Sequence, residues 1–295
     1  MNQHVWKSDI LLLITAVIWG FAFVAQRVGM EYVGPFTYNG IRFALGGLSL
    51  IPLIVYRRRY VASPAADGLG TGRGRFFFGA ALAGVFLFAG ASFQQAGLVY
   101  TTAGNAGFIT GLYVVIVPIM GLFWRQAAGL GTWVGAVLAA IGLYLLSVTS
   151  EFTIATGDLL VLCSAFLWAS HVLIIGWLSP RTDSILLAAF QFGVCSALSL
   201  CTAAVVETIA LEGIVQAAVP ILYGGLMSVG VAYTLQVVAQ KNAHPAHASI
   251  LLSLEAVFAA VGGWIVLHEV LSIRGLTGCA LMLAGMLISQ LWRHR

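Results

Sequence analysis

Residues 9–27 have the sequence DILLLITAVIWGFAFVAQR, in which only the first and last residues carry a formal charge. A helix of about 20 apolar residues is long enough to cross the hydrocarbon core of a bilayer. The whole 295-residue chain is similarly apolar, with 60% hydrophobic and 8% charged residues and a mean hydropathy of +0.98. A soluble domain carries about 25% charged residues, and without them it would expose large apolar patches. The sequence therefore predicts a protein that crosses the bilayer several times.

Outward from this first segment, breaks at charges and at Gly, Pro and Asn separate further apolar segments. The predicted fold class is all-α integral membrane, with ten transmembrane helices and little chain left for a soluble domain. The predicted spans are residues 9–27, 35–56, 76–99, 104–124, 129–148, 157–178, 184–206, 217–239, 246–267 and 274–292. Because Trp19-Gly20-Phe21 continues the first apolar run without a signal-peptide cleavage pattern, we expect this span to be retained.

Basic residues predict the orientation of these spans, since Lys and Arg accumulate in cytoplasmic loops. With the N-terminus inside, only Arg27 and Arg274 fall in outer loops. Eleven basic residues fall inside: Lys7, Arg57, Arg58, Arg59, Arg73, Arg75, Arg125, Arg181, Lys241, Arg293 and Arg295. We therefore expect both termini in the cytoplasm and the chain in the plasma membrane, the inner membrane of a bacterial cell. The net charge of +4 follows from this topology, and no nucleic-acid partner is predicted.

The sixth predicted span resembles the first at an offset of 149 residues. The matched pairs are Asp9 with Asp158, Thr15 with Ser164, Ala16 with Ala165 and Trp19 with Trp168. Each half of the chain, residues 1–150 and residues 151–295, would hold five spans, so the two halves must lie in opposite orientations. Inverted repeats are typical of secondary transporters, whose interchangeable halves allow alternating access to a central site. Chance similarity between Ala-, Gly- and Leu-rich helices is the alternative explanation.

Several short motifs lie in or beside the first, second and ninth spans. They are Trp19-Gly20-Phe21-Ala22-Phe23-Val24, Gly34-Pro35, Arg42-Phe43, Leu254-Glu255 and His268-Glu269-Val270-Leu271-Ser272. On these residues the chain resembles the ten-span EamA-type branch of the drug/metabolite transporter superfamily, over essentially its whole length. The resemblance implies a ten-helix exporter of small metabolites such as amino acids. Two departures weaken any transfer of substrate identity: Ala256 replaces a common proline, and Trp124-Arg125-Gln126 replaces a common glycine-glutamate turn.

One face of the first span and the matching face of the sixth combine aromatic and polar side chains. These faces are formed by Thr15, Trp19, Ala22 and Gln26, and by Ser164, Trp168, His171 and Ile175. Polar groups that face lipid are costly, so both faces are expected to border protein or a water-filled cavity. We predict that Trp19, Phe23, Trp168 and His171 line a substrate cavity near the midplane. Core packing and interfacial anchoring of the tryptophans are the alternatives.

Glutamine and tyrosine side chains add neutral hydrogen-bonding groups to the third and eighth spans. The predicted cavity residues there are Gln94, Gln95, Tyr233 and Gln236, and weaker candidates elsewhere are Asn105, Tyr113, Ser249 and Ser253. Amides and phenols supply donors and acceptors suited to a zwitterion or another small polar solute. For any single residue the alternative role is an interhelical hydrogen bond, worth about 1 kcal/mol.

Only three acidic, basic or histidine residues lie well inside predicted spans, namely Arg42, His171 and Glu255. Such residues are candidates for a functional site. Arg42 and Glu255 are predicted either to form a structural ion pair between two helices or to leave Glu255 as a proton-coupling carboxylate. Because charges are so few, we expect a cavity bounded by aromatic and neutral polar groups, with little fixed charge.

These features predict a secondary transporter that exports small metabolites, with amino acids as the first candidates. Cationic drugs, nucleobases and sugars are alternative substrates for the same fold. An intramembrane enzyme is an alternative of another class, suggested by His244-x-x-His247, by His268-Glu269 and by Ser92 as a nucleophile with His171 as its base.

Against the enzyme alternative, neither histidine motif has a third metal ligand, and Ser92 has no oxyanion-hole signature beside it. Against a channel, no ring of like charge is evident. We therefore predict neither enzymatic activity, nor a cofactor, nor a metal. The expected partners are a small-molecule substrate and the lipid bilayer, and a monomer is compatible with the sequence, which leaves the oligomeric state open.

Overall fold

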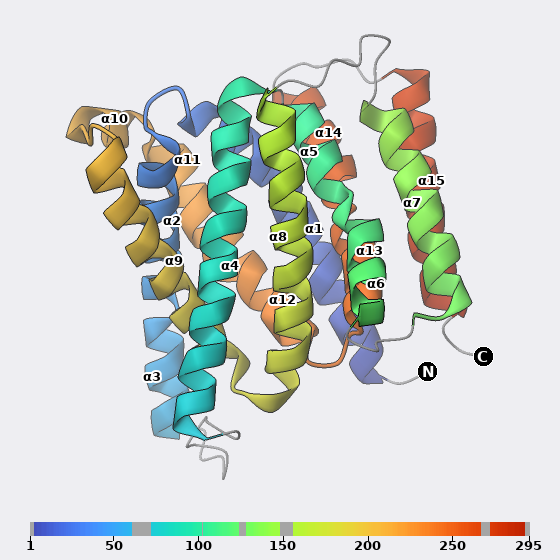
Figure 1. The fold of residues 1–295 in the computed structure, drawn as a ribbon, viewed down its shortest axis with the longest axis horizontal. Helices are drawn as coiled ribbons and strands as arrows, with labels where there is room; N and C mark the ends of the chain where they lie inside the picture. Colours follow the sequence, from blue (N-terminus) through green and yellow to red (C-terminus); the bar gives the residue numbers. More distant parts are fainter. Residues whose placement is uncertain are drawn as a thin grey trace.

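The computed structural model describes residues 3–60, 72–101, 103–123, 128–147, 156–266 and 272–292, and every regular element in these ranges is a helix. The long helices stand side by side and form one bundle (Figure 1). The uninterrupted long helices are α1 (Gln3–Gly29), α4 (Arg73–Tyr100), α7 (Leu130–Ser147), α8 (Thr156–Leu178), α9 (Ser184–Val206) and α15 (Ile273–Leu291). The all-α prediction is therefore confirmed for the described part of the chain.

Several helices begin at residues that suit a helix N-terminus. The Asp183 carboxylate accepts hydrogen bonds from the backbone N–H groups of Ile185 and Leu186, at 2.9 and 3.1 Å, and so caps α9. Proline stands in the first turn of α2 at Pro35 and of α13 at Pro245, where its missing N–H costs no helical hydrogen bond.

Other helical segments are interrupted where the sequence predicted continuous spans. They are α2 (Pro35–Ser49) with α3 (Ile51–Tyr60), α5 (Ala103–Gly111) with α6 (Tyr113–Phe123), α11 (Ala218–Leu222) with a π-helical segment (Tyr223–Tyr233) and α12 (Thr234–Ala239), and α13 (Pro245–Leu252) with α14 (Glu255–Val266). A short 3-10 turn (Ser179–Arg181) and the helix α10 (Leu211–Gln216) lie outside the predicted spans.

Three of these interruptions share one type of backbone hydrogen bond. The N–H of Leu112 bonds to the carbonyl of Ile109, and the N–H of Leu254 bonds to that of Leu251, at 3.2 and 3.3 Å. Between α2 and α3, the N–H of Leu50 likewise bonds to the carbonyl of Gly47 at 3.2 Å. Each bond reaches three residues back instead of four, which tightens the turn and redirects the helix that follows. Hydrophobic periodicity does not detect such a change, which explains why the predicted spans 104–124 and 246–267 were continuous.

Seven helical segments are long and apolar enough to cross a membrane. They are Trp6–Gly29, Pro35–Tyr60, Gly74–Tyr100, Thr156–Arg181, Ser184–Val206, Ala218–Ala239 and Pro245–Val266. Three shorter apolar helices, Ile109–Phe123, Leu130–Leu145 and Ile273–Ser289, occupy the other predicted spans. A membrane protein is thus supported by length and composition, and the count of ten spans stays a prediction.

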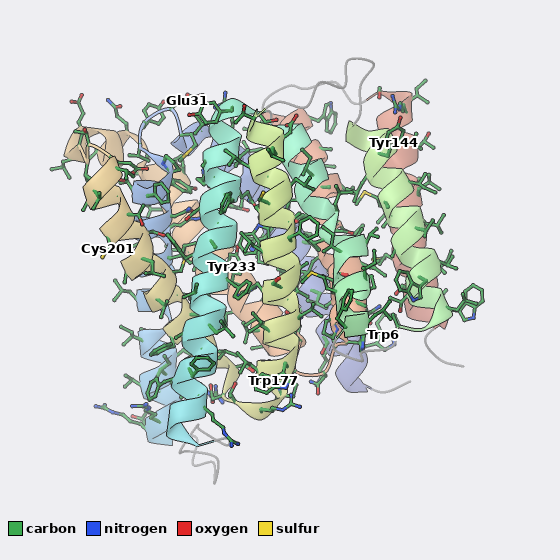
Figure 2. The ribbon with its side chains drawn as sticks, in the orientation of Figure 1. Trp6, Glu31, Tyr144, Trp177, Cys201 and Tyr233 are labelled. Atoms are coloured by element: carbon green, nitrogen blue, oxygen red, sulfur yellow. The ribbon has the colours of Figure 1, made fainter. Side chains whose placement is uncertain are left out.

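Exposed aromatic residues lie near the two ends of the bundle. Figure 2 places Trp6 and Trp177 toward one end and Tyr144 toward the other, and these side chains are 48%, 53% and 52% exposed. Tryptophan and tyrosine are enriched at both membrane–water interfaces. The first turn of α1 and the last turn of α15 lie at the same end of the bundle, together with the end of α3 (Figure 1).

The helices pack in a regular set of pairs. The helix α1 contacts α14 and the π-helical segment, and α8 contacts α5–α6 and α4. The helix α2 contacts the π-helical segment, and α4 contacts α9. Further contacts join α2 to α9 and α7 to α15. In the last pair the backbones approach so closely that a Cβ atom added at Gly135 would lie 2.7 Å from the carbonyl oxygen of Gly285. Small residues allow this approach in membrane helices.

The C-terminus of α9 is tied to the N-terminus of α2 by Glu207. Its carboxylate accepts hydrogen bonds from the backbone N–H groups of Phe36 and Thr37, both at 2.8 Å, and from the Thr37 hydroxyl at 2.7 Å. The first N–H groups of a helix have no intrahelical partner, and a carboxylate beside them also complements the helix dipole. Glu207 therefore serves as a cap supplied by another helix.

We expect Glu207→Ala to lower the free energy of unfolding by about 2 kcal/mol, because the variant removes three charge-assisted hydrogen bonds. Thermal unfolding of the purified protein in detergent measures the change. Glu212→Ala is the matched control, since the Glu212 carboxylate accepts only a 3.5 Å bond from Gln216 on an exposed face of α10. Equal destabilisation by the two variants would contradict the capping role.

Candidate functional site

A pocket lies inside the bundle and contains about 450 Å³ of space that no protein atom fills, part of it open to solvent. Its wall combines side chains from both halves of the sequence, supplied by α1, α2, α4, α5–α6, α8, the π-helical segment and the helices that follow it. Figure 2 shows Tyr233, one of the lining residues, about midway between the two ends of the bundle. Pockets between the helices of a bundle, with a few convergent polar groups, are typical places for a small-molecule site.

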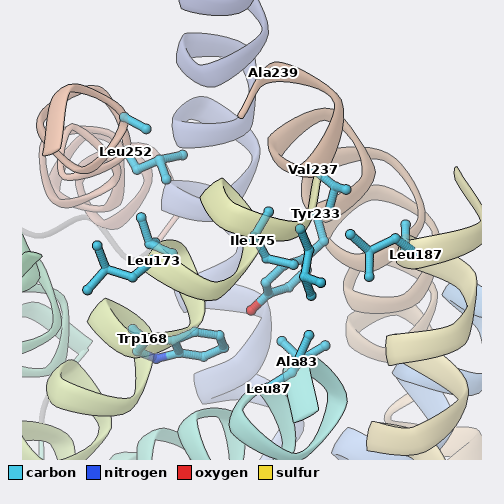
Figure 3. Close-up of a cluster of buried hydrophobic side chains, with 14 of the residues drawn as sticks. Ala83, Leu87, Trp168, Leu173, Ile175, Leu187, Tyr233, Val237, Ala239 and Leu252 are labelled. Carbon is cyan, nitrogen blue, oxygen red and sulfur yellow. The ribbon is translucent and has the colours of Figure 1, made fainter. Parts of the chain in front are cut away.

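Aromatic rings form much of this wall. The predicted residues Trp19, Phe23, Tyr113, Trp168 and Tyr233 all line the pocket. The Tyr233 ring centroid lies 4.5 Å from that of Trp19 and 6.0 Å from that of Trp168. Figure 3 shows the Tyr233 hydroxyl pointing toward Trp168. The pocket therefore has aromatic surfaces contributed by α1, α8 and the π-helical segment.

Hydrogen bonds hold the two tryptophan rings in place. The Trp168 indole N–H donates to Oε1 of Gln94 at 2.7 Å, and Nε2 of Gln94 donates to Oε1 of Gln26 at 3.4 Å. The Trp19 indole N–H donates to the backbone carbonyl of Ser228 at 3.3 Å. Buried tryptophan usually finds such an acceptor, and here the bonds orient each ring toward the pocket. The interaction with Ser228 also brings the π-helical segment against α1.

Some lining residues were not selected from the sequence: Gln26, Thr110, Val172, Ser228 and Leu252. Gln26 shares the helix face of Trp19, so helical spacing alone could have identified it. The others had no comparable signal.

Two polar atoms at the pocket have no hydrogen-bond partner among the described residues, namely Oγ1 of Thr110 and Oε1 of the predicted residue Gln236. Buried polar atoms are normally paired. These two are therefore available to a bound solute.

Arg42 and Glu255 line the same pocket. The Arg42 Nε donates to Oδ1 of Asn39 at 2.9 Å, and Oε1 of Glu255 accepts a hydrogen bond from the Tyr113 hydroxyl at 3.0 Å. The ion pairs found in the described part of the chain are Arg57–Asp183 and His247–Asp9, so no nitrogen of Arg42 lies within 4.0 Å of a Glu255 oxygen.

The predicted ion pair between Arg42 and Glu255 is therefore wrong for this structure. The rest of the wall agrees with the expected pocket of aromatic and neutral polar groups, because Arg42 and Glu255 are its only acidic or basic residues among those described. Sequence spacing places each residue along its helix, whereas the packing of helices distant in the chain decides that both face one space. Proton coupling through Glu255 stays a prediction.

Four of the predicted site residues lie away from the pocket wall. His171 is fully buried, and its Nε2 is 2.9 Å from Oε1 of Gln191. The buried Gln95 side chain donates to the backbone carbonyl of Gln26. Ser249 and Ser253 each donate at 2.8 Å to a carbonyl of their own helical segment. None of these four side chains lines the pocket, although Oε1 of Gln95 and Nδ1 of His171 have no hydrogen-bond partner among the described residues. Their predicted contact with substrate stays a prediction.

Asn105 was also a predicted site residue. It belongs to α5, and its side chain lies outside the described residues.

The residues behind the enzyme alternative have other partners. His247 is buried between Asp9 and Ser289, with its Nε2 and Nδ1 each 3.0 Å from an oxygen of these side chains. His171 bonds to Gln191 and not to Ser92. The described residues contain no group of three or more His, Cys, Asp or Glu side chains that could hold a metal. His268 and Glu269 lie outside the described residues.

The bundle of long apolar helices around this pocket is that of a multi-pass membrane protein. The model of the EamA-like transporter family matches residues 6–148 and again residues 155–290. The chain therefore belongs to the EamA-like transporter family, within the drug/metabolite transporter superfamily.

Three similar proteins illustrate this relationship. An uncharacterized transporter of Archaeoglobus fulgidus is 31% identical over 96% of this chain and 86% of its own length. A probable amino-acid metabolite efflux pump of Salmonella typhimurium is 27% identical over 55% of this chain and 51% of its own. A crystal structure with 17% sequence identity superposes with a TM-score of 0.78 over 97% of this chain and 96% of its own, which shows a shared fold.

Proposed function

We propose that this chain is a secondary transporter that exports small metabolites, with amino acids as the first candidates, by alternating access to the pocket. The observation that carries the proposal is the pocket itself, where aromatic rings surround one guanidinium and one carboxylate that do not pair with each other. The partial relative in Salmonella typhimurium, a probable amino-acid metabolite efflux pump, adds support. Transporter sites near the bilayer midplane are typically formed where two repeats meet.

Two interchangeable halves are part of this proposal. The repeated match of the family model supports them. So does the packing. We exchange α1 with α8, α2 with α9, α4 with the π-helical segment, α5–α6 with α13–α14 and α7 with α15. The α2–α9 and α7–α15 pairs then map onto themselves, and each other helix pair described above maps onto another such pair. The interruptions at Leu112 and Leu254 correspond under the same exchange. Rocking of one half against the other would expose the pocket to each side in turn.

We also propose ten membrane spans, with both termini on the cytoplasmic side of a bacterial inner membrane. The three shorter apolar helices support the count, because Ile109–Phe123 runs alongside α8, and α7 and α15 run alongside each other (Figure 1). The basic residues support the orientation, since Arg57, Arg58 and Arg59 end α3 on the side where α1 begins. Positive charge accumulates on the cytoplasmic side.

Counterflow in liposomes tests the proposed function. We expect purified protein to accumulate labelled neutral amino acid in vesicles preloaded with the same unlabelled compound, with a flux that saturates, because a carrier exchanges substrate through one occupied site. Vesicles without protein are the control. Stimulation only by cationic drugs, nucleobases or sugars would replace the proposed substrate, and a linear flux with large conductance would indicate a channel.

A further inference from the structure

We infer that the pocket recognises its substrate as a zwitterion, in which Arg42 binds the carboxylate and Glu255, positioned by Tyr113, binds the ammonium group. The inference rests on the proposed function and assigns each end of the substrate to a residue. From the sequence, Arg42 and Glu255 were expected either to form an ion pair or to leave Glu255 as a proton-coupling carboxylate.

The Arg42 guanidinium is held in place by its neighbours and has two nitrogens free to bind an anion. It is 2% exposed and is the only lysine or arginine that is buried in the described part of the chain. Its Nε is held by Asn39, and its Cζ lies 5.3 and 5.0 Å from the ring centroids of Tyr38 and Phe43. These contacts fix the plane of the guanidinium. Its two terminal nitrogens have no hydrogen-bond partner among the described residues, so they can bind a carboxylate through two parallel bonds.

Glu255 supplies the opposite charge. It is the first residue of α14, it is 4% exposed, and it lines the pocket. One carboxylate oxygen accepts the Tyr113 hydroxyl at 3.0 Å, and the other has no hydrogen-bond partner in the described ranges. That free oxygen can accept an ammonium N–H. The Trp19 and Tyr233 rings, 4.5 Å apart, add electron-rich faces that favour a cation.

Tyr113 acts on the substrate through Glu255. Tyr113 is the first residue of α6, directly after the interruption at Leu112. Glu255 is likewise the first residue of α14, directly after the interruption at Leu254. Their hydrogen bond therefore joins the two repeats at the pocket wall. Because this bond occupies Oε1 and fixes the carboxylate, a single acceptor remains for the substrate. We assign Tyr113 as a positioning residue.

The separation between the Arg42 and Glu255 side chains favours a zwitterionic substrate. Arg42 and Glu255 stay more than 4.0 Å apart, although both line one pocket with Tyr233. A buried charge without a partner is unfavourable in a membrane interior. A zwitterion pairs both charges at once, whereas an amine or a carboxylic acid leaves one of them uncompensated. A neutral sugar or nucleobase compensates neither, so the pocket favours amino acids over these classes.

The test measures binding by isothermal titration of the purified protein in detergent, so that variants need not transport. The ligands are the neutral amino acid with the strongest counterflow, its decarboxylated amine and its deaminated acid; for leucine these are 3-methylbutylamine and 4-methylpentanoate. We expect both analogues to bind wild-type protein at least about 30-fold more weakly than the amino acid, because each loses one charge-assisted contact.

The variants should then show a crossed pattern. Arg42→Gln is expected to weaken amino-acid binding about 30-fold and to leave binding of the amine unchanged or tighter. Glu255→Gln is expected to weaken amino-acid binding similarly while sparing the acid. Tyr113→Phe should resemble Glu255→Gln with a smaller effect, about fivefold, because the carboxylate remains but is no longer fixed. A purely structural role would weaken all three ligands equally.

Three control variants replace an arginine, a glutamate and a tyrosine that lie outside the pocket. Arg57→Gln, Glu212→Gln and Tyr223→Phe lie outside the pocket and should leave all three affinities unchanged. Equal weakening of the three ligands by Arg42→Gln or Glu255→Gln, or unchanged amino-acid binding, would overturn the assignment. If Arg42→Gln does not fold, Arg42→Lys replaces it, and it too should weaken the amino acid more than the amine.

The two proposals fail in different ways. If wild-type protein neither binds nor exchanges any amino acid, the proposed function is wrong. If wild-type protein exchanges an amino acid and the variants show no crossed pattern, only the zwitterion assignment is wrong.

Discussion

Trp168→Ala is expected to reduce transport at least about tenfold while reducing the folded yield much less. The Trp168 ring faces Tyr233 across the pocket and orients Gln94 through the 2.7 Å bond from its indole N–H. The variant therefore removes an aromatic wall and frees Gln94. Aromatic residues at the centre of a binding site commonly contribute about 2 kcal/mol or more to binding. Counterflow per folded molecule, with folded yield taken from size-exclusion chromatography, measures the effect.

Trp177→Ala is the matched control on the same helix. The Trp177 side chain is 53% exposed and contacts Arg181 instead of the pocket. We expect this variant to transport normally. Trp19→Ala should behave like Trp168→Ala, because the Trp19 ring also contacts Tyr233, with ring centroids 4.5 Å apart. If both pocket variants transported at the wild-type rate, the pocket would not be the transport site.

Gly135→Val and Gly285→Val are expected to lower the free energy of unfolding by about 3 kcal/mol each. A Cβ atom at Gly135 would lie 2.7 Å from the carbonyl oxygen of Gly285, and one at Gly285 would lie 2.6 Å from that of Gly135. The opposing atoms belong to backbone, so they cannot rotate away and the helices must separate. Thermal unfolding in detergent and the yield of monodisperse protein measure the change.

Gly193→Val is the control for this pair. A Cβ atom at Gly193 in α9 would meet nothing within 4 Å, so the larger side chain fits without displacing a neighbour. We expect wild-type stability for this variant. If all three valine variants were equally stable, the close packing of α7 against α15 would be wrong.

Much of the pocket could be predicted from helical spacing. Trp19 and Trp168 share faces with polar residues in the first and sixth spans, and both line the pocket. The same reasoning selected His171, which lies behind Trp168 and bonds to Gln191. Spacing cannot separate these cases, because it identifies a helix face and not the helix that covers it.

The interrupted helices were beyond sequence reasoning for a different reason. Apolar residues continue through the interruptions at Leu112 and Leu254, so the hydropathy shows no boundary. At each interruption two backbone N–H groups bond three residues back instead of four, those of Leu112 and Val115 at the first and those of Leu254 and Ala256 at the second. These bonds place Tyr113 and Glu255 opposite each other, although 142 positions separate them in the chain.

The sequence by itself determined that this protein is a helical membrane protein and identified most residues of its pocket. Long apolar runs must form helices in a bilayer, because their backbone groups find no water to bond with. Only the tertiary structure decided that two oppositely charged side chains, Arg42 and Glu255, face the same pocket. Arg42 and Glu255 belong to different halves of the chain, and the rotation and packing of their helices bring both to one pocket without pairing them. The wall of the pocket thus combines aromatic and neutral polar groups with one arginine and one glutamate that do not pair.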